Sequence, residues 1–350
     1  MRRHRPIRGR AVLSYILRSA LLALVLAFAV PTAPAADEAP LKTLPVPLDP
    51  MHPAITRLGA LDYVAGFVLM PAPTLLATKP AAPWGGLSDM MLAPDGTALL
   101  SVADIGWWWR LTLTRDAQGR LTGVPTAEAA PLRDLVGAPL VKKFESDAES
   151  MTRLADGRWL VGFERDHRIW SYPGADAAVS LPEGPATSFG APAEIRDLPE
   201  NNGIEAMAEL PGGRLLMLAE GEEDAPGDGK GWIGKPGAWS PVTIRRSDGF
   251  RPTALAALPS GGVLLLERYF TKANGPGARI SYLPAASLAG NARLEPTLLA
   301  EWHLPLTVDN FECLAVTPAP EGGFYIFVMS DDNQNPLQRT LLLQFHWAGA

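Results

Sequence analysis

The feature that most constrains the fold is a hairpin motif that occurs five times along the chain. Each copy has a short apolar segment, a turn that contains glycine, and a second apolar segment that ends in a polar or acidic residue, as in "ESMTRLADGRWLVGFER". An apolar residue occupies the same phase in every copy, with spacings of 61, 56, 48 and 59 residues between Met90, Met151, Met207, Leu255 and Leu314. A repeat of about 50 residues is typical of β-propeller blades.

The turns and flanking segments support strands rather than helices. Asp95-Gly96, Asp156-Gly157 and Gly212-Gly213 supply the positive φ angles that tight hairpin turns require. Strand-like sequence such as "WWWRLTLT" and "TLLLQFHW" follows the hairpins. We therefore predict an all-β propeller with five blades by motif count, six being possible. An irregular β-sandwich is the alternative, but it does not explain the repeat.

The two ends of the repeat region predict how the ring closes. The last unit ends at Trp347 after three strands, one short of a blade, whereas the strand-like segment Ile55–Pro71 has no hairpin motif of its own. We predict that this segment supplies the outer strand of the last blade, which removes exposed sheet edges. Residues 55–350 then form a single propeller domain, and residues 36–54 are predicted to be a flexible lead.

Residues 1–35 have the pattern of an export signal. Five arginines lie within the first ten residues, Ala20–Val30 is uninterrupted and apolar, and Ala33-Pro34-Ala35 offers small residues for cleavage. Arg18 leaves the apolar run short for a membrane-spanning helix, which needs about 20 residues. We expect a cleaved signal peptide, a periplasmic or secreted protein and no stable membrane insertion after cleavage. An uncleaved anchor is the alternative.

The charge of the remaining chain restricts its partners. Residues 1–35 hold six arginines and no acidic residue, so their removal moves the formal net charge from −6 to −12. Such an acidic protein is unsuited to nucleic acid and better suited to cations. Cys313 is the only cysteine, which excludes an intramolecular disulfide and a cysteine-based metal site. We expect a monomer that acts on a small anionic or ester substrate.

Propeller topology predicts where the acidic residues of the repeat meet. The innermost strand of a blade starts on one face, turns at the other and returns, so both ends of each hairpin lie on one face around the channel. The equivalent positions at the start of the first strands are Ser88, Glu149, Glu205, Thr253 and Glu312, and those at the end of the second strands are Asp104, Glu164, Glu220, Glu267 and Asp331. Eight carboxylates would thus surround one channel mouth, accompanied by Arg165, Arg251 and Arg268.

Two interpretations of this ring remain open. In the structural one, Glu–Arg pairs such as Glu164-Arg165 stitch neighbouring blades together. In the functional one, surplus negative charge raises carboxyl pKa values or binds a hard cation, with calcium as the candidate. The candidate catalytic residues are Glu149, Glu164, Glu205, Glu267 and Glu312. The candidate substrate-binding residues are Arg165, Arg251 and Arg268, and the candidate metal ligands are Glu149, Glu205, Glu312 and Asp331.

The motifs resemble a known family, the bacterial phytase-like proteins, also called the esterase-like activity of phytase family. The resemblance extends over about residues 85–345 and rests on "GGLSDMMLAPDG", "DAESMTRLADGRWLVGFERDHRIWSYP", "NNGIEAMAELPGGRLLMLAEG", "FRPTALAALPSGGVLLLERYF", "NFECLAVTP" and "SDDNQNPLQRTLLLQF". It implies an exported propeller with esterase or phosphatase activity. Two residues depart from the family pattern, Asp89 where a small residue is usual and Cys313 where Gly or Ala is usual.

The sequence leaves three functions open. The first is a hydrolase of phosphate or carboxylic esters with an acidic site at the channel mouth, where a bound cation polarises the substrate and a free carboxylate such as Glu164 or Glu267 is the general base. The second is a non-catalytic propeller that binds a ligand or partner. The third is a scaffold.

Overall fold

The computed structural model describes residues 39–71, 82–174, 179–221, 227–246 and 249–349. Residues Ala36–Ala350 form one compact unit. The predicted signal peptide lies outside the described residues. Within the described ranges, no helix is both long and apolar enough to cross a membrane.

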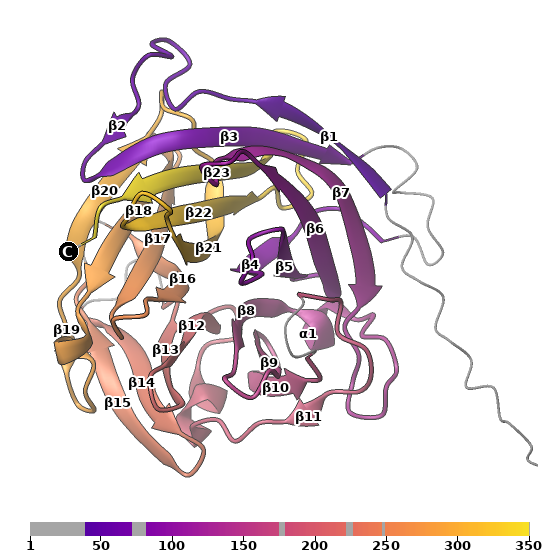
Figure 1. The fold of residues 1–350 in the computed structure, drawn as a ribbon. Helices are drawn as coiled ribbons and strands as arrows, with labels where there is room; N and C mark the ends of the chain where they lie inside the picture. The colour runs from indigo at the N-terminus through magenta and orange to yellow at the C-terminus, as the bar shows by residue number, and fades with distance from the viewer. Residues whose placement is uncertain (1–38, 72–81, 175–178, 222–226, 247–248, 350) are drawn as a thin grey trace, which may run out of the picture. The chain divides into compact units, whose positions relative to one another are not determined.

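The described strands group into five sets of four antiparallel strands (Figure 1). The first set is β4 (Leu87–Leu92), β5 (Ala98–Ala103), β6 (Trp107–Arg115) and β7 (Leu121–Pro131), and the second is β8 (Ala148–Arg153), β9 (Trp159–Phe163), β10 (Arg168–Tyr172) and β11 (Thr187–Ser188). The third is β12 (Ile204–Leu210), β13 (Arg214–Ala219), β14 (Gly229–Lys235) and β15 (Ala238–Ile244), and the fourth is β16 (Arg251–Ala257), β17 (Val263–Thr271), β18 (Gly275–Leu283) and β20 (Thr297–His303). The fifth is β21 (Asn310–Pro318), β22 (Phe324–Asp331), β23 (Thr340–Trp347) and β3 (Leu61–Pro71).

The remaining elements are short. Strand β2 (Arg57–Leu58) pairs with β3, and β19 (Arg293–Leu294) runs parallel to β15. Helix α1 (Lys143–Ser146) precedes β8, and two 3₁₀ turns, η2 (Ala193–Asp197) and η3 (Ala285–Ser287), lie in connections. The all-β propeller prediction is confirmed.

Ring closure by the two ends of the chain is also confirmed. Strand β3 pairs antiparallel with β23, from Leu61 opposite Trp347 to Leu69 opposite Thr340. The prediction of a flexible lead is wrong for residues 39–45, which form strand β1 (Ala39–Pro45). This strand pairs with β3 on one side and β7 on the other, so it joins the fifth set to the first.

The five innermost strands form a closed ring around the channel. Strands β4, β8, β12, β16 and β21 each contact the next, and β21 contacts β4 again. In each innermost strand the pairing register shifts at the same point, because one residue there has no partner on the neighbouring strand of its set. The five unpaired residues are Ser88, Glu149, Glu205, Thr253 and Glu312. These β-bulges are the first-strand positions expected from the repeat, and a bulge redirects the side chain that it carries.

Apolar clusters between neighbouring sets hold the ring together. One cluster joins Leu100 and Trp108 of the first set to Met151 and Trp159 of the second. The hairpin turns lie at the opposite face from the bulges, and Gly96 and Gly157 have φ angles of 67° and 91°, as those turns require. The packed sets therefore fix the bulged residues relative to one another.

Candidate functional site

The ends of the second strands carry a second group of equivalent positions. The backbone N–H groups of Asp104, Glu164 and Glu220 bond to the carbonyl groups of residues two before the bulges, Gly86, Asp147 and Gly203. In the fifth set the corresponding residue is Asp331, opposite Asn310. Four of the five predicted second-strand positions are thus equivalent in the structure.

The structure does not place Glu267 with them. In the fourth set the corresponding pair is Arg251 and Arg268, whereas Glu267 lies one residue earlier, opposite Pro252. A shift of one residue moves a strand side chain to the other face of the sheet. The carboxylate of Glu267 instead makes a bidentate ion pair with Arg279, at 2.7 and 2.8 Å, and both side chains are buried.

Arg279 is in turn held by an aromatic ring, because its guanidinium lies 4.3 Å from the ring centre of Phe250. A buried carboxylate with a bidentate partner is a structural ion pair. Glu267 therefore does not belong to the site as a candidate catalytic base.

Seven of the predicted carboxyl groups lie at the face that carries the bulges, and Asp147 joins them; we call these eight the carboxylate ring. They are Asp104, Asp147, Glu149, Glu164, Glu205, Glu220, Glu312 and Asp331. Two groups within the ring bring carboxylate oxygens within 4.8 Å of one another. The first group is Asp104, Asp147 and Glu149, and the second is Glu164, Glu205 and Glu220.

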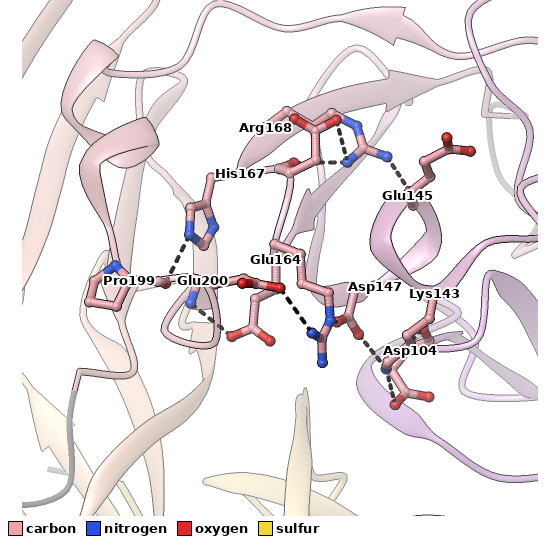
Figure 2. Close-up of polar contacts among 12 residues, drawn as sticks. Asp104, Lys143, Glu145, Asp147, Glu164, His167, Arg168, Pro199 and Glu200 are labelled. Carbon is pink, nitrogen blue, oxygen red and sulfur yellow. Dashed lines mark hydrogen bonds and ion pairs between the residues drawn. The ribbon is translucent and has the colours of Figure 1, made fainter.

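The first group already contains a basic side chain. Helix α1 places Lys143 so that its Nζ lies 2.6 Å from Asp104 Oδ2 and also pairs with Asp147 (Figure 2). Arg165 forms a further ion pair with Asp147 and lies 3.3 Å from Glu200. Burial opposes the charge on Lys143, but Asp104 and Asp147 raise its pKa above the ordinary value, so the ammonium stays charged.

In the second group both basic side chains pair with a single carboxylate. Glu220 Oε1 pairs with Arg251 at 3.0 Å and with Arg268 at 3.4 Å, and Glu164 Oε1 accepts the Gly203 N–H at 3.0 Å. Glu205 makes no hydrogen bond or ion pair with any residue that the structure describes, although it is only 6% exposed. Burial, together with the charges of Glu220 and Glu164, raises the pKa of Glu205 well above its usual value.

Two further ring residues lie in the fifth set. Glu312 Oε1 is 3.2 Å from Arg268 and accepts a 2.7 Å hydrogen bond from Asn310. Burial raises the pKa of Glu312 to about 7, against the opposing effect of Arg268. Asp331 accepts the Asn333 N–H at 2.8 Å, and burial with the charge of Glu312 raises its pKa to about 8.

Carboxyl groups outnumber bases in the ring. Its basic partners are Lys143, Arg165, Arg251 and Arg268, each already paired with a ring carboxylate. If all eight carboxyl groups were ionised, four negative charges would remain. Such a surplus is relieved by holding protons or by binding a cation. Accordingly, burial raises the pKa of Glu164 to about 7, and burial with the charges of Glu205 and Asp147 raises that of Glu149 well above its usual value.

The arrangement revises the predicted roles. The four predicted metal ligands do not form one cluster, because Glu149 and Glu205 belong to different groups while Glu312 and Asp331 lie in neither. The three predicted substrate-binding arginines are engaged by Glu220 and Asp147. Sequence reasoning missed Asp147 and Lys143. The position of Asp147, two residues before Glu149 and thus on the same side of the strand, was the available signal for it.

Comparison with known proteins finds similar chains at low sequence identity and one matching family. Among solved structures, similar chains include a catalytically inactive virginiamycin B lyase from Staphylococcus aureus with quinupristin (12% identity, TM-score 0.38, covering 84% of this chain and 81% of that one). Another is a putative gluconolactonase (13% identity, TM-score 0.37, covering 76% of this chain and 90% of that one). A third is the Cps50 (Swd1) β-propeller domain of Myceliophteria thermophila (8% identity, TM-score 0.37, covering 86% of this chain and 98% of that one).

No curated protein matches the chain. The model of the phytase-like family, described as esterase-like activity of phytase, matches residues 82–334. This match spans most of the propeller, from the first innermost strand to the loop after Asp331. The chain belongs to the phytase-like family.

Proposed function

We propose that the protein is a carboxylic-ester hydrolase whose carboxylate ring holds a divalent cation, with calcium as the candidate. The observation that carries the cation is Glu205, a buried carboxylate without a partner in the described chain, beside two others. The ester chemistry is supported by the description of the family, esterase-like activity of phytase.

Glu164, Glu205 and Glu220 would hold the cation. Their donor set is all oxygen, which suits Ca²⁺, and oxygens within 4.8 Å of one another fit around an ion whose Ca–O distances are about 2.3–2.6 Å. In the first group Lys143 already takes the place of a cation. When bound, the ion would polarise the ester carbonyl and lower the pKa of a bound water.

The other residues of the ring would position groups and supply a proton. Arg251 and Arg268 hold Glu220, and the Gly203 N–H orients Glu164. Asp331, with a pKa of about 8, carries a proton at neutral pH and is the candidate acid that protonates the leaving alcohol, and the proton released by the attacking water would replace it. Glu267, held by Arg279, takes no part.

The charge of the ring favours carboxylic over phosphate esters. A phosphate dianion needs basic partners, preferably bidentate ones, but all four basic groups of the ring are paired with carboxylates. A neutral ester meets no such repulsion. We therefore place carboxylic esters ahead of phosphate esters, which would depend entirely on the bound cation.

Hydrolysis of 4-nitrophenyl acetate and 4-nitrophenyl phosphate, each with calcium and with a chelator, tests the proposal. We expect calcium-dependent hydrolysis of the acetate that Glu205→Gln removes. The exposed Glu194→Gln is the matched control and should behave as wild type. A rate of acetate hydrolysis that is unchanged by the chelator and by Glu205→Gln would contradict the proposed site.

A non-catalytic binding propeller is the second candidate. It is favoured by ion pairs that link neighbouring sets, since Arg268 of the fourth set contacts Glu220 of the third and Glu312 of the fifth. Calcium binding measured by calorimetry, without turnover of either ester, would favour this function. Export to the periplasm or medium and a monomeric state also remain proposals.

A further inference from the structure

The end of the channel that lies away from the carboxylate ring has a mostly apolar lining. Three residues beyond each bulge, the innermost strands carry Met91, Thr152, Ala208, Ala256 and Ala315. These residues line a cavity of about 190 Å³ together with neighbours such as Leu255 and Val316. All five innermost strands contribute to it, and alanine at three of the five equivalent positions leaves the space open. We call it the apolar cavity.

Asp89 lies on β4 between the bulged residue Ser88 and Met91, which lines the apolar cavity. Its carboxylate accepts the N–H groups of Met90 and Met151, at 2.8 and 2.9 Å, and that of Leu314. These three residues are equivalent, each two positions beyond a bulge, so Asp89 ties β4, β8 and β21 together there. No residue lines the apolar cavity and also belongs to either carboxylate group of the ring. The two ends are separate sites.

The size and lining of the cavity define what it can hold. An apolar cavity of about 150 Å³ is large enough to bind benzene, whereas a buried water needs two to four polar partners. The Thr152 hydroxyl already accepts the Glu209 N–H at 3.3 Å, and the charged residues of the lining are Arg153 and Glu209, both partly exposed. The remaining lining residues are apolar, so an uncharged, apolar ligand group fits the cavity best.

The cavity adjoins two others at the turn face. A neighbouring cavity of about 380 Å³ shares Glu209, Ala257 and Val316 with it, and another of about 280 Å³ shares Arg153 and Glu209. A ligand can therefore place one group in the apolar cavity while the rest of it lies along the hairpin turns.

We propose that the apolar cavity is a second ligand site, which binds an uncharged aromatic or branched aliphatic group of about the size of benzene. This site does not depend on the ester chemistry proposed for the carboxylate ring. Its occupant enters from the face of the hairpin turns, opposite the ring.

Benzene is the probe for the first test. The protein is labelled with ¹³C at the methionine methyl groups and titrated with benzene while NMR spectra are recorded. Met91 lines the cavity, whereas Met329 is buried in β22 and serves as the internal reference. We expect a saturable shift of the Met91 methyl signal and no shift of Met329. A Met91 signal that does not respond in the folded protein would overturn the proposal.

Filling the cavity provides the second test. Ala256→Leu and Ala315→Leu place side chains into the space, and Ala208→Val is a smaller change for use if the larger ones do not fold. Each folded variant should bind benzene at least about tenfold more weakly. Ala238→Leu, at an exposed position, is the matched control and should bind as wild type. Unchanged affinity in the filled variants would show that benzene binds elsewhere and would also overturn the proposal.

Discussion

Replacement of Asp331 by asparagine should stabilise the cation-free protein, and the gain should grow with pH. Burial raises the pKa of this carboxyl from 3.8 to about 8, and the residue is only 3% exposed. Between these two pH values the folded state binds the proton more tightly than the unfolded state. The contribution of Asp331 therefore lowers the free energy of unfolding as pH rises from about 4 to about 8.

The size of the effect follows from the shift. Each pH unit in this window costs about 1.4 kcal/mol, so keeping Asp331 protonated costs about 2 kcal/mol at pH 5 and about 4 kcal/mol at pH 7. Asparagine removes this cost, since it does not titrate, and its side-chain oxygen can still accept the Asn333 N–H. The advantage of Asp331→Asn over wild type should thus increase by about 2–3 kcal/mol from pH 5 to pH 7.

Urea unfolding in the presence of a chelator, at pH 5, 6, 7 and 8, measures this difference. The matched control is Asp156→Asn, because the hydrogen bond from Arg158 lowers the pKa of the exposed Asp156 and the trend should not appear there. A variant less stable than wild type at every pH would refute the reasoning. It would mean that Asp331 is ionised in the folded protein and needed as an anion.

Three further predictions concern other parts of the ring and its supports. Lys143→Gln removes the ammonium shared by Asp104 and Asp147, so calorimetry should detect an additional calcium site; unchanged calcium stoichiometry would contradict this. Arg279→Met leaves Glu267 buried without its bidentate partner and should lower the free energy of unfolding by about 3–5 kcal/mol, while calcium-dependent stabilisation in thermal melting stays as in wild type. Asp89→Ala leaves three backbone N–H groups without their acceptor and should cost more than about 3 kcal/mol in urea unfolding, since each unsatisfied buried group costs about 1–3 kcal/mol.

The fold could be predicted because its signal is repeated. Each hairpin carries the same phase of apolar residues and the same turn chemistry, and the five bulges fall where the repeat placed equivalent residues. Strand β1 gave no such signal. Its sequence "APLKTLP" contains two prolines and matches none of the repeats. Its strand conformation depends on pairing with β3 and β7, which the local sequence of β1 does not specify.

The site could be predicted less completely, because a single step of register decides which side a strand residue faces. The dipeptides Glu164-Arg165 and Glu267-Arg268 look equivalent in the sequence. In the structure Glu164 follows the end of β9, whereas Arg268, not Glu267, occupies the corresponding place on β17. The repeat pattern alone does not fix the register of a hairpin to one residue. Lys143 was missed for another reason, since it reaches the ring through a helix of four residues outside the repeat.

The position of Arg268 explains why the charge is distributed unevenly around the ring. Of the ten equivalent positions around the mouth, seven are acidic, Ser88 and Thr253 are neutral, and Arg268 is the single basic one. Its guanidinium lies between Glu220 and Glu312, so the fourth set neutralises the carboxylates on both of its sides. Lys143 does the same for the first group from outside the repeat. Glu205 lies between these two basic groups and pairs with neither, so part of the surplus charge lies where the cation is proposed to bind.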